Sequence, residues 1–308
     1  MEYEYRMFET IIGNKKIKQI LQNSLKKNVV SHSYMFIGID GIGKKIMAKE
    51  FAKRILCLNE DLAESCSCKS CIEFNTNNNP DFLIIEPEGN SIKIEQIRNL
   101  QKMIQEKPII SNRKVYIIDN ADLMTKEAQN CLLKTLEEPP EYAVIILIGS
   151  NENMFLATIK SRCMIIHFDK ISNQELKEYL KSNFSINQIS DKMLNMFQGS
   201  IGKAINLKDK QEEYESIFTF VDNLEKMDII DLYKLAEPLY KLKDEIFDIL
   251  DYINVLLLEK AKQKNIYVDC INIVENTKKR LKQNGNYDMS IDNMVFNMCD
   301  VLFRKDVI

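Results

Sequence analysis

The stretch from Gly38 to Lys45, with the sequence GIDGIGKK, constrains the fold more than any other part of this chain. It matches the pattern G-x-x-x-x-G-K and comes directly after an apolar, β-prone run, SYMFIG at 33–38. When such a loop joins a strand to a helix, its glycines let the backbone approach a phosphate closely, and the N–H groups at the helix start point towards that anion. We therefore predict a phosphate-binding loop whose Lys44 reaches the outer phosphates, rather than a chance glycine-rich turn.

Four more short apolar runs, several of them separated by helical segments, extend this unit into a sheet. They lie at 81–85, 114–119, 143–149 and 163–168. Strands that alternate with helices favour a parallel sheet with helices on both faces, and continuous apolar runs fit strands that are buried on both sides. The predicted fold class is therefore α/β with a parallel sheet. His32 and His167 flank strands without an evident partner, so we interpret them as structural.

After about residue 169 the pattern becomes wholly helical. Ser172 and Glu175 have the spacing of a capping box at the start of one helix, and Gly199 and Gly202 are expected to break the helices near 200. The predicted domains are an α/β domain at 1–168, a small helical domain at 169–208 and an all-α domain at 209–308.

The loop departs in one position from what magnesium-dependent hydrolysis needs. Lys45 stands where Ser or Thr would ligate the metal, and an ammonium group cannot coordinate a cation. The strand at 114–119 ends in Asp119, which is placed to hold magnesium from its outer shell, although a strand end with an Asx-type turn is the alternative. Asp122 is expected to cap or pair locally. Nucleotide binding can survive the change at Lys45, whereas hydrolysis is expected to suffer.

Four of the eight cysteines fall within one short segment, at Cys57, Cys66, Cys68 and Cys71. We expect no disulfide framework, because the chain shows no secretory signal, and clustered cysteines then point to a metal. Four thiolates satisfy tetrahedral zinc, so we predict a structural zinc site, with reduced surface cysteines as the alternative. The single residue between Cys66 and Cys68 is fewer than usual and strains chelation by that pair. The remaining cysteines are expected in the core: Cys131, Cys163, Cys270 and Cys299.

Composition and net charge limit the partners and the cellular location that we expect for the protein. The chain has 308 residues, with 42 basic and 45 acidic side chains and a net charge of −3. A protein that binds DNA through its own surface is usually basic, so any contact with DNA should be local or made by partners. No apolar run reaches about 18 residues, so we expect no transmembrane helix and a cytoplasmic protein.

Two linked motifs resemble the clamp-loader branch of the AAA+ ATPases. They are NCLLKTLEEPP at 130–140 and TIKSRC at 158–163, and HSYMFIG at 32–38 is similar to that family as well. The resemblance implies an AAA+ P-loop domain, a helical lid domain and a C-terminal helical collar domain. It also implies that Arg162 is an arginine finger that reaches a neighbouring subunit's ATP site, worth about a thousandfold or more in rate. From the residues alone, an exposed arginine before a strand would be the simpler interpretation.

The resemblance extends to further positions around the nucleotide. GSIGKA at 199–204 is similar to a motif whose basic residue senses phosphates, which implies Lys203, although a solvated lysine after a C-cap glycine is equally open. Active members place Glu after Asp119, where this chain has Asn120, and a neutral amide is no useful general base. The first sensor position, near Gly149 and Ser150, is left unassigned. The predicted nucleotide-binding residues are Gly38, Gly41, Gly43, Lys44, Lys45, Asp119 and Lys203.

Subunits of this family also resemble the chain in having a zinc module soon after the phosphate loop. Within the family, Lys45 and Asn120 argue against the gamma/tau motor, and Arg162 argues against the delta clamp opener. The delta-prime type remains: a stator without ATPase activity of its own that supplies a finger in trans. This implies a hetero-pentamer with gamma/tau and delta subunits, which reaches the sliding clamp and primer-template DNA through the complex.

Two alternatives stay open. The chain could be an ATP-hydrolysing motor, and magnesium-dependent turnover by the purified chain would support that. It could instead be a scaffold that binds ATP or ADP without hydrolysis, because the loop glycines and Lys44 are present. Titration with labelled ATP, with and without magnesium, distinguishes a scaffold from an empty loop.

Overall fold

The computed structural model describes residues 8, 11–59, 66–184, 194, 197, 199–206, 211–283 and 285–303. The chain divides into two compact units, Met1–Lys203 and Ala204–Ile308, which are described separately below. The separate lid domain at 169–208 stays a prediction.

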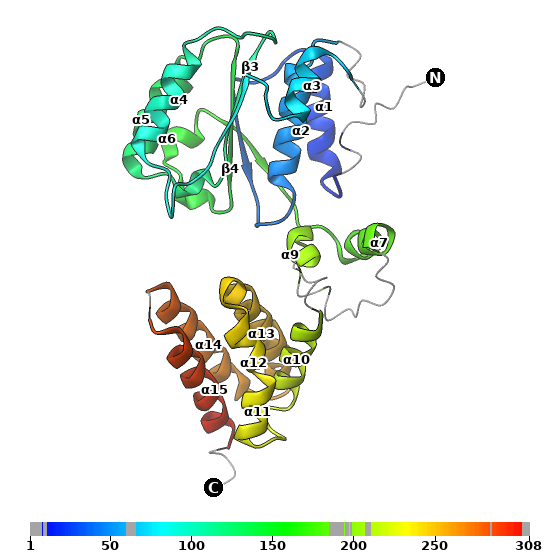
Figure 1. The fold of residues 1–308 in the computed structure, drawn as a ribbon, viewed down its shortest axis with the longest axis vertical. Coiled ribbons are helices and arrows are strands. Elements are labelled where there is room, and N and C mark those ends of the chain that lie inside the picture. The colour runs from blue at the N-terminus through cyan, green and yellow to red at the C-terminus, as the bar shows by residue number, and fades with distance from the viewer. Residues whose placement is uncertain are drawn as a thin grey trace. The chain divides into compact units, whose positions relative to one another are not determined.

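A five-stranded parallel sheet forms the centre of the first unit (Figure 1). The strands lie in the order β2-β3-β4-β1-β5, and each neighbouring pair is parallel. Their bounds are β1 Ser33–Ile37, β2 Phe82–Ile85, β3 Lys114–Ile118, β4 Ala143–Gly149 and β5 Met164–His167. The α/β class, the parallel sheet and all five predicted strand segments are confirmed.

The burial of the central strands explains their sequence pattern. Every residue of β1, β3 and β4 is buried, because helices cover both faces of the sheet. A strand in that position needs apolar side chains on both faces, and its residues therefore run as a continuous apolar segment instead of alternating with polar ones. The edge strand β5 is only partly buried, and its Met164 and His167 are exposed.

Helices cover both faces of the sheet: α1, α2 and α3 lie on one face, and α4, α5 and α6 on the other (Figure 1). Their bounds are α1 Lys15–Lys26, α2 Lys44–Leu56, α3 Lys69–Asn75, α4 Ile94–Ile104, α5 Lys126–Glu137 and α6 Ala157–Lys160. The unit also contains the 3₁₀ turns η1 Ala121–Leu123 and η2 Glu152–Met154, and the helix α7 Asn173–Phe184. Helix α9, Ile201–Asn206, crosses the boundary between the two units.

Local signals fix where α5 begins and ends. The Thr125 hydroxyl accepts a hydrogen bond from the Ala128 N–H at 3.2 Å and so caps the N-terminus of the helix. Leu132 is fully buried against the sheet. The helix ends at Glu137, before Pro139 and Pro140, because proline cannot continue a helical hydrogen-bond ladder. The carboxylate of Glu137 is therefore held at the C-terminal end of α5.

The start of α7 has the predicted capping box. The Ser172 N–H donates to the Glu175 carboxylate, and the Glu175 N–H donates to the Ser172 hydroxyl, both at 3.2 Å.

The prediction that Gly202 breaks a helix is wrong, because Gly202 lies inside α9. Its lack of a side chain serves packing instead: a Cβ at Gly202 would lie only 2.9 Å from the Cα of Gly41.

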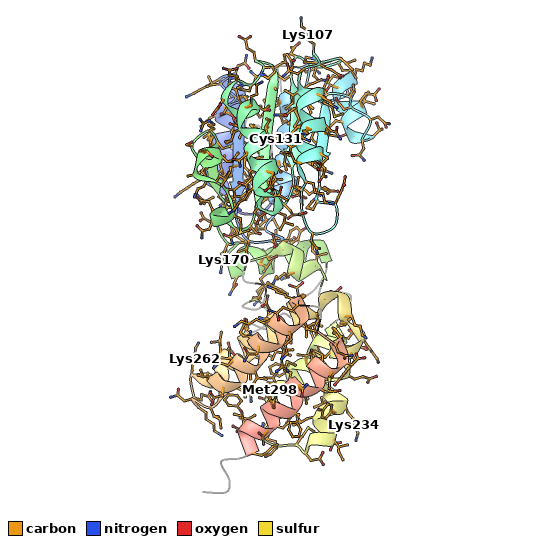
Figure 2. All side chains as sticks on the ribbon, turned by 90° about the vertical axis from the view of Figure 1, so that its left-hand side faces the viewer. Lys107, Cys131, Lys170, Lys234, Lys262 and Met298 are labelled. Atoms are coloured by element: carbon orange, nitrogen blue, oxygen red, sulfur yellow. The ribbon has the colours of Figure 1, made fainter. Side chains whose placement is uncertain are left out.

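The regular secondary structure among the described residues of the second unit is entirely helical. Their bounds are α10 Gln211–Asp222, α11 Ile229–Leu235, α12 Glu237–Lys241, η4 Lys243–Glu245, α13 Ile246–Ala261, α14 Tyr267–Lys282 and α15 Tyr287–Phe303. Short loops join α13, α14 and α15, which pack on one another in sequence order, and Met298 of α15 is fully buried (Figure 2). No helix in the described part of the chain is long and apolar enough to cross a membrane.

A buried carboxylate fixes the loop that leads into β3. Asp81 lies just before β2 and is 2% exposed. It accepts hydrogen bonds from the backbone N–H groups of Ile109, Ile110 and Ser111, each at 2.7 Å. The Ser111 hydroxyl in turn donates to the Leu56 carbonyl at the end of α2, so this loop links two layers of the unit.

Replacing Asp81 by Ala should lower the free energy of unfolding by about 3 kcal/mol, because three buried N–H donors lose their acceptor. Chemical denaturation of the full chain measures this. Glu88→Ala, which removes an exposed carboxylate beyond the same strand, is the matched control and should change stability little. Equal effects of the two substitutions would contradict this role of Asp81.

Candidate functional site

The phosphate-loop sequence forms the connection between β1 and α2. β1 ends at Ile37 and α2 begins at Lys44, so the strand–loop–helix context expected for this motif is present. Gly41 and Gly43 have φ angles of 72° and 96°, in the left-handed region that glycine enters without steric cost. The loop glycines are therefore needed for the backbone path itself.

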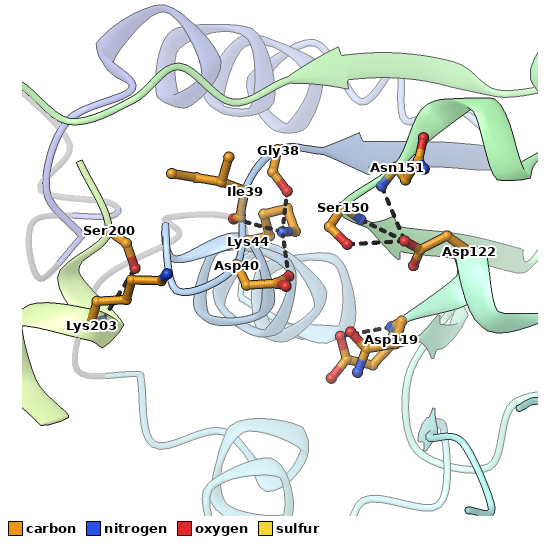
Figure 3. Close-up of polar contacts among 11 residues, drawn as sticks. Gly38, Ile39, Asp40, Lys44, Asp119, Asp122, Ser150, Asn151, Ser200 and Lys203 are labelled. Carbon is orange, nitrogen blue, oxygen red and sulfur yellow. Dashed lines mark hydrogen bonds and ion pairs between the residues drawn. The ribbon is translucent and has the colours of Figure 1, made fainter. Parts of the chain in front are cut away.

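Lys44 folds back onto the loop that precedes it. Its ammonium donates to the carbonyl oxygens of Gly38 at 2.5 Å and Ile39 at 2.9 Å, and it lies 3.7 Å from the Asp40 carboxylate (Figure 3). Burial lowers the pKa of Lys44, and the carboxylates of Asp40, Asp122 and Asp119 partly oppose that shift. A phosphate that engages Lys44 must replace these carbonyl contacts.

Lys45 places a second ammonium at the carboxyl ends of β2 and β3. Its Nζ lies 2.9 Å from Asp119 Oδ2 and also pairs with the carboxylate of Glu86. Partial burial lowers the pKa of Lys45, but the hydrogen bonds to Glu86 and Asp119 outweigh it and raise the pKa above its usual value. Asp119, the predicted metal-holding residue, is thus already neutralised by a cation of the same chain.

Asn120 follows Asp119 in a left-handed conformation, with a φ of 49°. Asn tolerates this region better than most side chains, because its short amide can bond locally. The backbone N–H of Asn120 donates to Asp119 Oδ1 at 3.1 Å. Both carboxylate oxygens of Asp119 therefore have donors within this chain.

The sequence context of Asp122 suggested that it caps or pairs locally, but its partners lie in another segment of the chain. Its Oδ2 accepts hydrogen bonds from the Ser150 N–H at 3.1 Å, the Ser150 hydroxyl at 3.0 Å and the Asn151 N–H at 3.0 Å (Figure 3). The parallel order of β3 and β4 brings these segments together, although 28 residues separate them in sequence. Asp122 thus fixes the turn after β4.

The segment around 200 packs directly on the phosphate loop. The Gly202 N–H donates to the Gly41 carbonyl at 2.9 Å, and a Cβ added at Gly41 would overlap the Ser200 hydroxyl. The Lys203 N–H donates to that hydroxyl at 3.2 Å, and the Lys203 ammonium points towards the loop (Figure 3). The structure thus brings the predicted nucleotide residues of both motifs together, while phosphate sensing by Lys203 stays a prediction.

Arg162 lies directly after α6, on the surface of the first unit, with a side chain that is 33% exposed. Its Nη1 donates to the Thr158 carbonyl at 3.0 Å and to the Ser161 hydroxyl at 3.2 Å. Its Nη2 forms an ion pair with Glu137 at 2.6 Å. The backbone at Arg162 is anchored to the sheet, because the hydroxyl of the buried Ser33 in β1 donates to the Arg162 carbonyl at 2.5 Å.

The four clustered cysteines converge between α2 and α3. Their sulfur atoms all lie within 4.8 Å of one another, and those of Cys57 and Cys66 are 3.5 Å apart. Four thiolates around one zinc ion are about 3.8 Å apart, given Zn–S bonds of about 2.3 Å, so the cluster could bind such a metal. The short Cys66–Cys68 spacing does not prevent this, because the chain turns tightly and the Cys68 N–H donates to Cys66 Sγ at 3.4 Å.

The thiols of the cluster differ in acidity. Burial raises the pKa values of Cys57 and Cys71. Burial also acts to raise the pKa of Cys68, but backbone hydrogen bonds from Leu58 and Cys71 lower it to about 7. Since metals bind thiolates, metal binding must release protons from the buried thiols of Cys57 and Cys71.

The four remaining cysteines lie in apolar surroundings. Cys270 and Cys299 are buried in the second unit, as predicted. Cys131 and Cys163 are only half-buried, although both pack against the core of the first unit. Burial raises the pKa of Cys163 to about 11, so this thiol stays protonated at neutral pH.

Sequence reasoning missed three partners of the site residues. Glu86 follows β2 as Asp119 follows β3, and the carboxyl ends of neighbouring parallel strands meet at one edge, so its position carried a usable signal. Glu137 carried no such signal, because its contact with Arg162 depends on how α5 and α6 pack. His167 lies 2.7 Å from the Glu152 carboxylate, which corrects the view that it lacks a partner.

Comparison with known proteins identifies the family of the chain. Residues 13–172 match the family model described as "DNA polymerase III, delta subunit". The chain belongs to the family of DNA polymerase III clamp-loader subunits. It is 35% identical over 202 residues to the DNA polymerase III subunit delta-prime of Bacillus subtilis, across 65% of this chain and 61% of that protein.

Other clamp-loader proteins are similar to a comparable degree. The DNA polymerase III subunit tau/gamma of Haemophilus influenzae is 32% identical over 212 residues, across 67% of this chain but 31% of that protein. A DNA polymerase III gamma subunit-related protein from Thermotoga maritima has a similar fold, with a TM-score of 0.54 at 19% identity over 92% of this chain and 99% of that one. The chain thus spans about a third to three fifths of these two curated relatives.

Replacing Cys71 by Ser should remove most of the bound zinc, because a tetrahedral site loses its most buried ligand. Metal analysis of the purified chain measures this, with about one zinc per wild-type chain expected. Cys131→Ser is the matched control, since it removes a half-buried thiol outside the cluster. A wild-type chain without stoichiometric metal would contradict the zinc prediction.

Proposed function

We propose that this chain is a stator subunit of the delta-prime type in a DNA polymerase III clamp loader. In this role it hydrolyses no ATP itself and supplies Arg162 to the ATP site of a neighbouring subunit. The proposed assembly is a hetero-pentamer with gamma/tau and delta subunits, which acts on the sliding clamp and primer-template DNA as a complex. The proposal includes a structural zinc ion bound by the cysteine cluster.

The ion pairs of Lys45 carry the proposal. Hydrolysis in related phosphate-loop proteins uses a magnesium ion held by a hydroxyl at this position and by an aspartate placed as Asp119 is here, directly after β3. Here the hydroxyl is missing, and the Lys45 ammonium lies 2.9 Å from Asp119. A divalent cation close to this ammonium would be repelled, and Asn120 offers no carboxylate to activate water.

Arg162 supports the second half of the proposal. Its guanidinium lies at the surface after α6, and its backbone is fixed to the buried start of β1. A charged group on a rigid support and partly exposed is suited to reach an anion on another subunit. The identities to delta-prime and to tau/gamma relatives are similar, so the ion pairs of Lys45 and the presence of Asn120, rather than the identities, favour the delta-prime type over the gamma/tau type.

Arg162→Ala should leave the chain folded and slow ATP turnover by the reconstituted loader. The rate of hydrolysis at the neighbouring site should fall about a thousandfold. Total turnover should therefore fall by the fraction that this site contributes in the wild-type loader. Steady-state hydrolysis with DNA and clamp present measures this. Lys134→Ala, which removes an exposed cation from α5, is the control. Unchanged turnover with Arg162→Ala would overturn the finger assignment.

A nucleotide-binding scaffold is the second candidate, and the loop geometry favours it over an unrelated role. The backbone path of a phosphate loop is present, with Gly41 and Gly43 in left-handed conformations and Lys44 at the start of α2. The extra ammonium of Lys45 could offset phosphate charge in place of a metal. Such a scaffold would bind ATP without a magnesium requirement.

Lys45→Ser should make ATP binding by the isolated chain depend on magnesium, because Asp119 and Glu86 lose their ammonium and a hydroxyl ligand appears. We expect the affinity for labelled ATP to rise severalfold on adding magnesium in this variant and to stay level in the wild type. Lys53→Ser, which makes the same charge change farther along α2, is the control. Magnesium-dependent binding by the wild-type chain would contradict this account of Lys45.

A further inference from the structure

The guanidinium of Arg162 already has partners within its own chain. Nη1 is engaged by the Thr158 carbonyl and the Ser161 hydroxyl, and Nη2 is paired with Glu137 at 2.6 Å. The first two partners belong to the same turn and shape the local backbone. Glu137 differs from them, because it comes from α5 and carries a full negative charge.

The position of Glu137 at the end of α5 makes its negative charge unfavourable unless a cation lies close to it. It is the last residue of α5, where the helix dipole is negative and a carboxylate is unfavourable. The buried Leu136 and the following Pro139 and Pro140 fix the backbone on either side. Arg162 supplies the positive charge that offsets both the helix end and the carboxylate.

We propose that Glu137 is a positioning residue that holds Arg162 in a parked conformation until a phosphate of the neighbouring subunit displaces it. This inference rests on the proposed role of Arg162 as a finger in trans. A carboxylate and a phosphate compete for the same guanidinium donors, and both are negatively charged. The finger therefore exchanges one anion for the other when it engages.

The exposure of the pair makes this exchange easy. The side chains of Arg162 and Glu137 are 33% and 48% exposed, and ion pairs in such surroundings contribute little to stability. A terminal phosphate carries more charge than a carboxylate and can replace it. The adjacent Glu138 is also exposed, and no ion pair involving it occurs among the described residues, so it provides a matched comparison.

The test is ATP turnover by the reconstituted loader with this chain as wild type, Glu137→Gln, Glu138→Gln or Arg162→Ala, over a range of ATP and salt concentrations. Removing the competing carboxylate should raise kcat/KM by about two- to fivefold at low salt. That gain should shrink as salt rises, because salt screens the exposed ion pair of the wild type. Glu138→Gln should match the wild type at every salt concentration.

The variants separate the two ways of failing. If Arg162→Ala leaves turnover unchanged, the finger role itself is wrong. If Arg162→Ala slows turnover but Glu137→Gln lowers kcat/KM or leaves it unchanged, the finger stands and the parked conformation is wrong. A gain that does not vary with salt, or that Glu138→Gln reproduces, also overturns the parking role, since it would reflect a general effect of surface charge.

Discussion

The ion pairs of Lys45 with Asp119 and Glu86 are the interaction on which the rest of the site depends. They bring one ammonium to the carboxyl ends of two neighbouring strands, at the edge where a phosphate-loop protein gathers the charges for hydrolysis. With that ammonium in place, Asp119 is neutralised without a metal. The loop thus has the backbone path of a phosphate loop, while a cation of the chain itself pairs with the carboxylate that was predicted to hold the metal.

The surroundings of the loop are adapted to this closed arrangement. Lys44 is bonded to the carbonyl oxygens of Gly38 and Ile39, and α9 packs on Gly41 through the backbone of Gly202. The loop is therefore supported on its own residues and on a second segment. A loop held in this way fits the proposed role as a rigid member of an assembly, in which Arg162 is the group proposed to reach a neighbour.

Much of the fold and part of the candidate site could be predicted from the sequence. The parallel sheet followed from apolar runs such as 114–119 and 143–149, because burial on both faces leaves a clear pattern. The Cys57–Cys71 cluster followed from its spacing along the chain. The tertiary partners could not be predicted in this way: Asp122 bonds to Ser150, and Arg162 pairs with Glu137, only because packing brings distant segments together.

Gly202 shows the same limit in another form. Its sequence context suggested a helix break, yet the residue lies inside α9, where the close approach of Gly41 leaves no room for a side chain. Glycine can serve conformation or packing, and the sequence does not distinguish the two. Glu86 was the one missed partner with a usable signal, since it follows β2 at the same edge of the sheet as Asp119.

The most direct test of the central claim is magnesium-dependent ATP hydrolysis by the isolated chain, with the protein in excess over radiolabelled ATP. If Lys45 replaces the metal, phosphate release should equal the protein-free background at every magnesium concentration. Release that rises with magnesium and disappears with Lys44→Ala would contradict the account, because it would show that this chain is itself a motor.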